Sequence, residues 1–298
     1  MKIKNIKNRK LVKSNDGVVG IVVALLLVGL FLSVLMIVQT TFIPNWMEQR
    51  EAEHMEEVSN QFAKLKYAID TQSLIGSFSN EKIQAMSSPI TLGSKEYPIL
   101  NSARSFGNLE IIPNSFSINI TNMTNHYVNY SFGSIKFSSH NAYFIEQNYV
   151  YEAGAIIMEQ ERGNILTIEP SFDVDFNNQN ITFNIPGLEV IGGKPSVSGY
   201  GTYPLRTEFN SSEINITSEI ETITVYTNYP HAWARYFNNS LQDEDLEWDG
   251  QDREYEIRIN ENSVVVDLSF SNDQIPFNMI LKISNIGVQL APGWIDYL

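Results

Sequence analysis

The chain contains no cysteine and few basic residues. Without cysteine it cannot form disulfides, use a thiol nucleophile, or bind zinc or an iron–sulfur cluster through sulfur. Its 20 Lys and Arg face 34 Asp and Glu, which gives a net charge of −14. Nucleic-acid binding needs a basic surface that replaces counterions, so we expect no nucleic-acid partner. With 298 residues, 43% of them hydrophobic, the chain can still bury a sizeable core.

Recognisable catalytic motifs are also absent. Glu53, His54 and Glu57 could bring an imidazole and a carboxylate together one helical turn apart, but an exposed, charged helix face explains them better. Nothing selects a carboxylate pair for glycoside hydrolysis. We therefore expect no enzyme activity and no cofactor, apart from the calcium site considered below. The four histidines are His54, His126, His140 and His231. None of them lies in a zinc-protease motif or beside a nucleophile elbow.

One long apolar run dominates the N-terminal part of the chain. Twenty-two residues from Gly17 to Val38 carry no charge, and a helix of that length, at ~1.5 Å per residue, spans a bilayer. Acidic residues follow the run, whereas six basic residues precede Asp16, so the positive-inside rule places the N-terminus in the cytoplasm and the rest outside. These six are Lys2, Lys4, Lys7, Arg9, Lys10 and Lys13.

The run is expected to remain on the protein as an anchor. It is longer than the apolar core of about 7–15 residues in a secretory signal peptide, and no small-x-small cleavage site follows it. Gly20 and Ala24 are four residues apart and could allow a close approach between helices. Because glycine is common in membrane helices, packing of copies through this pair is one interpretation and a lone anchor is the other.

A second helix is predicted after Pro44. The proline favours an end or kink of the first helix near Ile43, and Asn45 with Glu48 forms a capping-box pattern that restarts a helix. An apolar stripe then recurs at helical spacing, with charged residues on the other faces. Either it packs on the protein's own domain or it forms a seam between subunits. Its members are Met55, Val58, Phe62, Leu65 and Ile69.

From residue 76 onward, short β-branched and aromatic runs alternate with Asn, Ser, Gly and Pro. At least ten such runs predict a mainly-β, sandwich-like antiparallel domain. Arg162 and Gly163 separate two runs in a pattern that predicts a hairpin, and a short helix should follow Pro230 and end near Leu241. The predicted organisation is a basic cytoplasmic leader (1–16), a transmembrane helix (17–43), an amphipathic stem helix (44–75) and a β-rich extracellular domain (76–298).

The densest acidic stretch, residues 243–256, partly matches a calcium-binding loop. Asp245, Glu247, Asp249, Gly250 and Glu256 fall at the first, third, fifth, sixth and twelfth positions of an EF-hand loop. The third position is usually Asp or Asn, and Glu256 opens a strand-like pattern instead of a helix. An exposed acidic loop is therefore the favoured interpretation, with a calcium site as the alternative.

The predicted extracellular domain contains seven Asn-x-Ser/Thr sequences, which are potential glycosylation sites. The alternative is simply an Asn-rich β surface. The asparagines are Asn119, Asn122, Asn129, Asn180, Asn210, Asn215 and Asn238.

The leader resembles that of archaeal type IV pilins and archaellins, in which a short basic peptide is removed just before the apolar helix. Lys13 and Ser14, before Asn15, fit such a cleavage site, which implies a prepilin-type peptidase as a partner. The glutamate that the bacterial type carries at the fifth mature position falls on Val19. An uncleaved anchor is therefore the alternative.

Further segments resemble a family of archaeal pilin-like envelope proteins of unassigned function. They include IPNW (43–46), EHMEEV (53–58), YEAGAIIMEQERG (151–163), IEPSF (168–172), SVSGYG (196–201) and TNYPHAWARYF (227–237). The resemblance implies the topology and a β-rich domain at the cell surface, but no reaction. The leading hypothesis is a structural subunit of a surface filament or pseudopilus-like assembly that packs with copies of itself. The alternative is a singly anchored, non-assembling binding or adhesion module.

Overall fold

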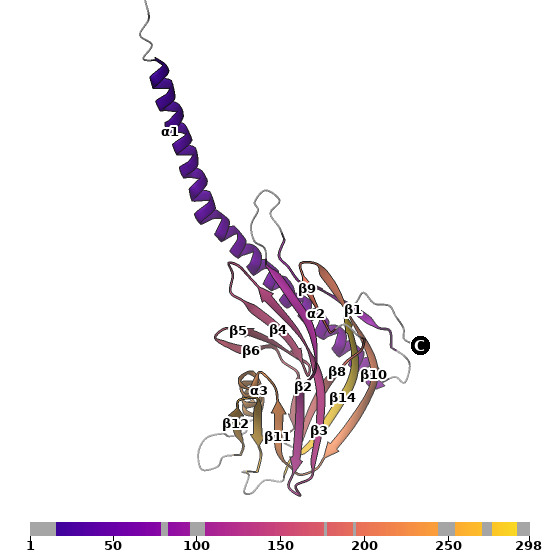
Figure 1. Ribbon diagram of the computed structural model, residues 1–298. Coiled ribbons are helices and arrows are strands. Elements are labelled where there is room, and N and C mark those ends of the chain that lie inside the picture. Colours follow the sequence, from indigo (N-terminus) through magenta and orange to yellow (C-terminus); the bar gives the residue numbers. More distant parts are fainter. Residues whose placement is uncertain are drawn as a thin grey trace, which may run out of the picture. The chain divides into compact units, whose positions relative to one another are not determined.

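The computed structural model describes residues 16–78, 83–95, 105–175, 178–192, 195–243, 254–269 and 276–290 (Figure 1). The chain divides into two units, Met1–Glu48 and Gln49–Leu298. The described part of the first unit is helical, with α1 at Asp16–Ile37. It supplies the one helix among the described residues that is long and apolar enough to cross a membrane.

A π-helical turn, η1 (Val38–Phe42), joins α1 to α2 (Ile43–Phe78). The expected restart of the helix at an Asn45 cap is therefore wrong, because α2 already begins at Ile43 and contains Pro44. Proline lacks an N–H and its ring displaces the carbonyl four residues earlier. The wider π turn, in which the Ile43 N–H donates to the Val38 carbonyl, accommodates this proline without ending the helix.

The described strands of the β domain form two connected sheets and are mainly antiparallel, which confirms the predicted fold class. One sheet, here sheet A, has the order β1 (Met86–Thr91), β10 (Thr202–Thr217), β14 (Asn278–Leu290), β8 (Asn180–Val190) and β7 (Ser171–Asp175). Its β14 and β8 are parallel, which the sequence did not indicate.

The second sheet, sheet B, is joined to sheet A where Gly133 of β3 pairs with Leu188 of β8. Its β2 pairs with β3, β9 and β11. The sheet continues from β3 through β4, β5 and β6, and from β11 through β13 and β12. Its strands are β2 (Phe106–Asn122), β3 (Tyr127–His140), β4 (Gln147–Glu152), β5 (Ala155–Gln160), β6 (Gly163–Ile168), β9 (Ser196–Gly199), β11 (Ile220–Tyr226), β12 (Glu256–Asn260) and β13 (Ser263–Asp267).

Two local predictions are confirmed by the structure. The strands β5 and β6 form the antiparallel hairpin expected around Arg162 and Gly163. The short helix expected after Pro230 is α3 (Pro230–Gln242), with the proline in its first turn.

The described residues of the domain form two hydrophobic clusters, and the long strands contribute to both. In β14, Met279, Leu281 and Ile283 belong to the cluster around α3, whereas Ile286 and Val288 belong to the cluster under α2. Alternate residues of a strand point to opposite faces. One face of β14 is therefore buried along its first half and the opposite face along its second half.

The apolar stripe of α2 is fully enclosed in the second of these clusters. Met55, Val58, Phe62, Leu65 and Ile69 are each at most 1% exposed. They pack with residues of β1, β2, β3, β4, β10 and β14. Of the two arrangements that the sequence left open, this is the one in which the stripe packs on the protein's own domain.

Candidate functional site

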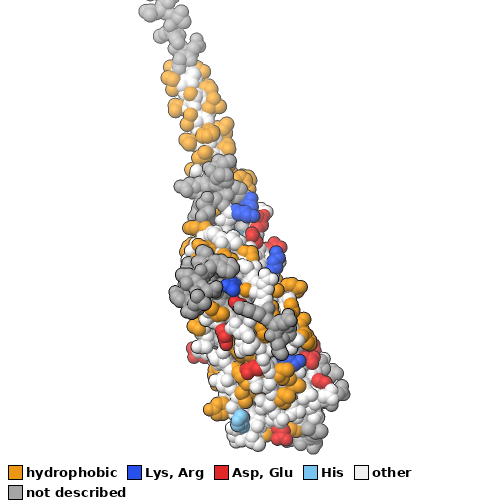
Figure 2. Space-filling model, turned by 90° about the vertical axis from the view of Figure 1, so that its right-hand side faces the viewer, with side chains coloured by type: hydrophobic (Ala, Val, Ile, Leu, Met, Phe, Trp, Pro, Cys, Tyr) orange, Lys and Arg blue, Asp and Glu red, His pale blue; other side chains and the backbone are white. Residues whose placement is uncertain are grey.

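The surface of α1 is the most extensive apolar feature of the first unit. Its large hydrophobic side chains from Val18 to Ile37 are between 41% and 69% exposed (Figure 2). A side chain added at Gly20 would meet nothing within 4 Å, so the Gly20 and Ala24 positions are open to another helix. A continuous apolar surface of this size is not stable in water and needs lipid or protein to cover it.

Two ionisable side chains of α2, Glu51 and His54, are buried, contrary to the expectation of an exposed charged face. Glu51 is 0% exposed, and its carboxylate accepts backbone N–H groups of Ala142, Tyr143 and Phe144 at 3.0, 2.8 and 2.7 Å. Such charge-assisted bonds compensate for the loss of water around the carboxylate. Glu51 therefore fixes the β3–β4 loop to the helix.

His54 is buried beside β1, whereas its neighbours Glu53 and Glu57 are exposed. Its Nε2 lies 3.0 Å from the carbonyl oxygen of Thr91. Because a carbonyl only accepts, Nε2 carries the proton and Nδ1 is unprotonated in the neutral ring. Nδ1 is buried and has no hydrogen-bond partner among the described residues. Burial lowers the pKa of His54, partly opposed by the Thr91 bond and by nearby glutamates.

A second buried carboxylate connects α3 to the sheet. Glu152, at the end of β4, is 1% exposed and accepts the Thr227 hydroxyl at 2.6 Å and the Trp233 indole N–H at 2.8 Å. Burial raises the pKa of Glu152 to about 7, although both hydrogen bonds oppose the shift. The carboxylate is enclosed and holds the start of α3 in place.

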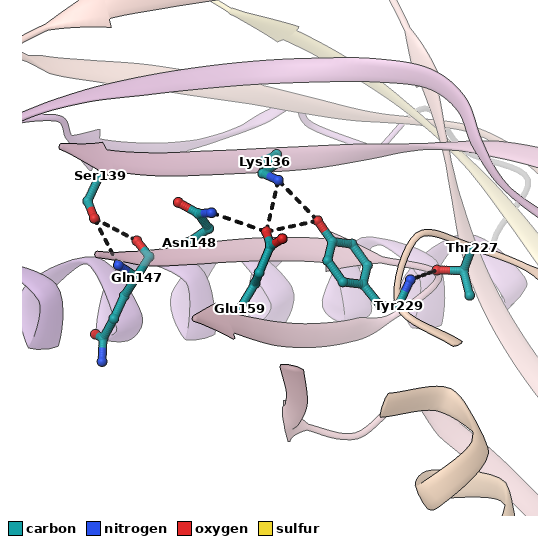
Figure 3. Close-up of polar contacts among 7 residues, drawn as sticks. All are labelled: Lys136, Ser139, Gln147, Asn148, Glu159, Thr227 and Tyr229. Carbon is teal, nitrogen blue, oxygen red and sulfur yellow. Dashed lines mark hydrogen bonds and ion pairs between the residues drawn. The ribbon is translucent and has the colours of Figure 1, made fainter. Parts of the chain in front are cut away.

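A half-buried polar cluster lies beside it (Figure 3). Glu159 Oε2 of β5 is 2.9 Å from Lys136 Nζ and accepts Asn148 Nδ2 at 3.1 Å and the Tyr229 hydroxyl at 3.3 Å. Burial alone would raise the pKa of Glu159, but the contacts with Lys136 and Asn148 outweigh it and lower the pKa. Burial and the charge of Glu159 raise the pKa of Tyr229.

Sequence reasoning missed both clusters. Segments 151–163 and 227–237 were singled out by resemblance, and the structure brings them together, with Glu152 and Glu159 from the first and Thr227, Tyr229 and Trp233 from the second. The available signal was a pair of glutamates inside otherwise apolar strands. Their geometry ties β3, β4 and β5 to α3, which is a structural role.

The processing and calcium predictions fall largely outside the described residues. This applies to Lys13, Ser14 and Asn15, and to Asp245, Glu247 and Asp249. Glu256 is described, opens β12 and lies 3.5 Å from Arg258 in an ion pair. Within the described ranges, no group of three or more His, Asp or Glu side chains could hold a metal ion.

The potential glycosylation sites differ in access. Asn129 and Asn210 are exposed, whereas the other five asparagines, Asn119, Asn122, Asn180, Asn215 and Asn238, are half-buried. The amide nitrogen, where a glycan would attach, is buried in Asn215. The structure therefore ranks Asn129 and Asn210 ahead of Asn215.

An open cavity of about 440 Å³ lies between the second half of α2 and sheet A. Lys66, Asp70, Phe78 and Lys282 line it, together with several serines. Lys66 and Asp70 form an ion pair at 2.7 Å. The side-chain oxygen of Ser73, which also lines the cavity, is buried and has no hydrogen-bond partner within the described part of the chain. The cavity thus combines charged, hydroxyl and aromatic groups.

The chain belongs to a family of unknown function, DUF7289, whose model matches residues 17–269. No curated protein and no solved structure shows significant similarity to it. The match begins in the apolar helix and includes most of the β domain, so both parts are features of the family.

Proposed function

We propose that this member of the DUF7289 family is a pilin-like cell-surface protein, held by α1 in the membrane with its β domain outside, and assembled with copies of itself through α1. In this proposal the chain carries out no catalytic step. Its six N-terminal basic residues remain on the cytoplasmic side until a prepilin-type peptidase removes the leader near Lys13 and Ser14.

The observation that carries the proposal is the contrast between the two helices. The stripe of α2 is covered by the protein's own strands, whereas the apolar side chains of α1 are 41% or more exposed. A surface helix of a water-soluble domain would be apolar on one side only. The all-round apolar surface of α1 suits a lipid bilayer or a core of packed helices.

A singly anchored binding module is the second candidate. It is favoured by the cavity beside α2, where Lys282 is exposed and Phe78 is 84% exposed, so that both are accessible to a ligand. The two candidates share the anchor and the outward β domain. They differ in whether α1 contacts other copies of α1.

Disulfide scanning of α1 distinguishes them. Because the chain has no cysteine, a single substitution at each position from Val18 to Leu32 gives cross-links only between copies. In native membranes, assembly predicts oxidative dimers that recur with a helical period of about 3.6 residues on the face of Gly20 and Ala24. The matched control is a cysteine at exposed Ile214 in β10. Cross-linking in α1 that is no greater than this control, without periodicity, would favour the single anchor.

A further inference from the structure

Exposed apolar side chains gather at the end of the β domain that carries the β3–β4 loop. Phe106 opens β2, Tyr200 lies in the β9–β10 turn, and Tyr143 and Ile145 lie in the β3–β4 loop. They are 39%, 47%, 41% and 60% exposed, respectively. We call these four residues the apolar rim.

Contacts within the domain hold the rim together. The rings of Phe106 and His140 stack with centroids 4.4 Å apart, and Phe106 meets Tyr200 edge-on at 6.3 Å. The β3–β4 loop follows His140 directly, and Asn141 Nδ2 donates to the Ile145 carbonyl at 3.0 Å. Three separate segments of the chain thus form one continuous surface.

The loop that carries Tyr143 and Ile145 is fixed to the start of α2. The Glu51 carboxylate accepts the backbone N–H groups of Ala142, Tyr143 and Phe144. Glu51 follows Trp46 by only five residues in the sequence. Trp46 is 43% exposed and lies three residues after the predicted transmembrane helix (17–43), a position typical of an aromatic anchor at a membrane surface. Five residues span at most about 18 Å even when fully extended, so the loop that Glu51 holds is tied by a short length of chain to the predicted membrane segment.

The side-chain types match that environment. The tyrosine, phenylalanine and isoleucine side chains of the rim expose apolar surface, and each tyrosine adds a hydroxyl group. Aromatic residues of this kind are enriched where proteins meet the membrane–water interface. Exposed charges of both signs lie near the rim, Glu146 in the loop and Lys95 next to β1. Attraction to anionic lipid is therefore weak, and apolar contact is the main contribution.

We propose that the apolar rim rests on the lipid bilayer that holds α1, with Tyr143 and Ile145 in the headgroup layer. This inference depends on the proposed membrane anchoring and adds a second membrane contact. It makes the bilayer, and not a second copy of the chain, the partner of this end of the β domain.

The test is a labelling experiment on the full-length protein in nanodiscs of zwitterionic lipid. Ile145→Cys and Tyr143→Cys each carry an environment-sensitive fluorophore, and Ile214→Cys is the matched control. Ile214 is 65% exposed on β10, twelve residues along the strand from Thr202 and so on the order of 40 Å away. Lipids with a nitroxide on the headgroup should quench the labels at 145 and 143 but not the label at 214. The extent of quenching should be the same in zwitterionic and anionic nanodiscs, because apolar contact is the main contribution.

The possible failures are distinguishable. If the protein stays with the discs and the labels at 145 and 143 are quenched no more than the label at 214, the rim proposal is overturned and the anchor stands. Labels shielded from an aqueous quencher but not reached by the lipid quencher would identify a second copy as the partner and also overturn it. If the protein does not remain with the discs, both proposals fail.

Discussion

The indole N–H of Trp233 donates to the carboxylate of Glu152 over 2.8 Å, in a site from which water is excluded. Trp233 is 0% exposed and packs against Phe116, Phe183 and Phe237. The largest side chain of the α3 cluster is therefore oriented by a buried ionisable group. This pairing makes the stability of the domain sensitive to pH.

The Glu152→Gln substitution should flatten the pH dependence of unfolding. The pKa of Glu152 is raised from 4.5 to about 7 in the folded state, so the folded state binds the proton more tightly. The resulting stabilisation is complete below pH 4.5 and is lost as the pH rises through 7, a change of about 3 kcal/mol. Denaturant unfolding from pH 4 to 8 measures it. Equal slopes in the wild type and the variant would refute the role of this carboxylate.

His54 should contribute the opposite slope. Burial lowers its pKa below 6.5, so the unfolded chain binds the proton more tightly. The stabilising contribution is present above pH 6.5 and is lost as the pH falls through the lowered folded-state pKa. In His54→Gln, whose amide can still donate to Thr91, the loss of stability on acidification should be smaller. Denaturant unfolding between pH 4 and 8 measures this. If the free energy of unfolding falls equally with acidification in the wild type and the variant, His54 does not cause the loss of stability at low pH.

Phe62→Ala should destabilise the β domain by about 3–5 kcal/mol, as for other large-to-small changes in a core. Phe62 is 0% exposed and lies in the cluster under α2. Tyr67→Ala is the matched control, since Tyr67 lies on the same helix and is 74% exposed. Chemical denaturation of the full chain in detergent compares the two. A change of similar size in both variants would contradict a buried stripe.

If the chain is glycosylated, Asn129 and Asn210 should carry glycan and Asn215 should not. The first two side chains are exposed, whereas the amide nitrogen of Asn215 is buried. Mass spectrometry of glycopeptides from the native cell surface measures the occupancy of each position. Glycan on Asn215 with none on Asn129 would be incompatible with this fold.

The features found correctly from sequence are those with a strong local period. The spacing of Met55, Val58 and Phe62 predicts one helix face, and the alternating runs after Gly76 predict strands. The environment of Glu51 and His54 depends on contacts with residues 142–144 and with Thr91, far away in sequence. No local pattern reports such contacts, and the same holds for the parallel pairing of β14 with β8.

The anchoring of the chain by α1, with the β domain outside the cell, is the part of the proposed function on which the rest depends. Its most direct measurement is the labelling of single cysteines in intact cells with a membrane-impermeant maleimide, at Asn129→Cys in β3 and at Lys4→Cys in the leader. The control is the cysteine-free parent chain. We expect labelling at position 129 in intact cells. Position 4 should be labelled only after lysis, in cells that lack the prepilin-type peptidase and therefore retain the leader. Labelling at 4 but not at 129 in intact cells would contradict it.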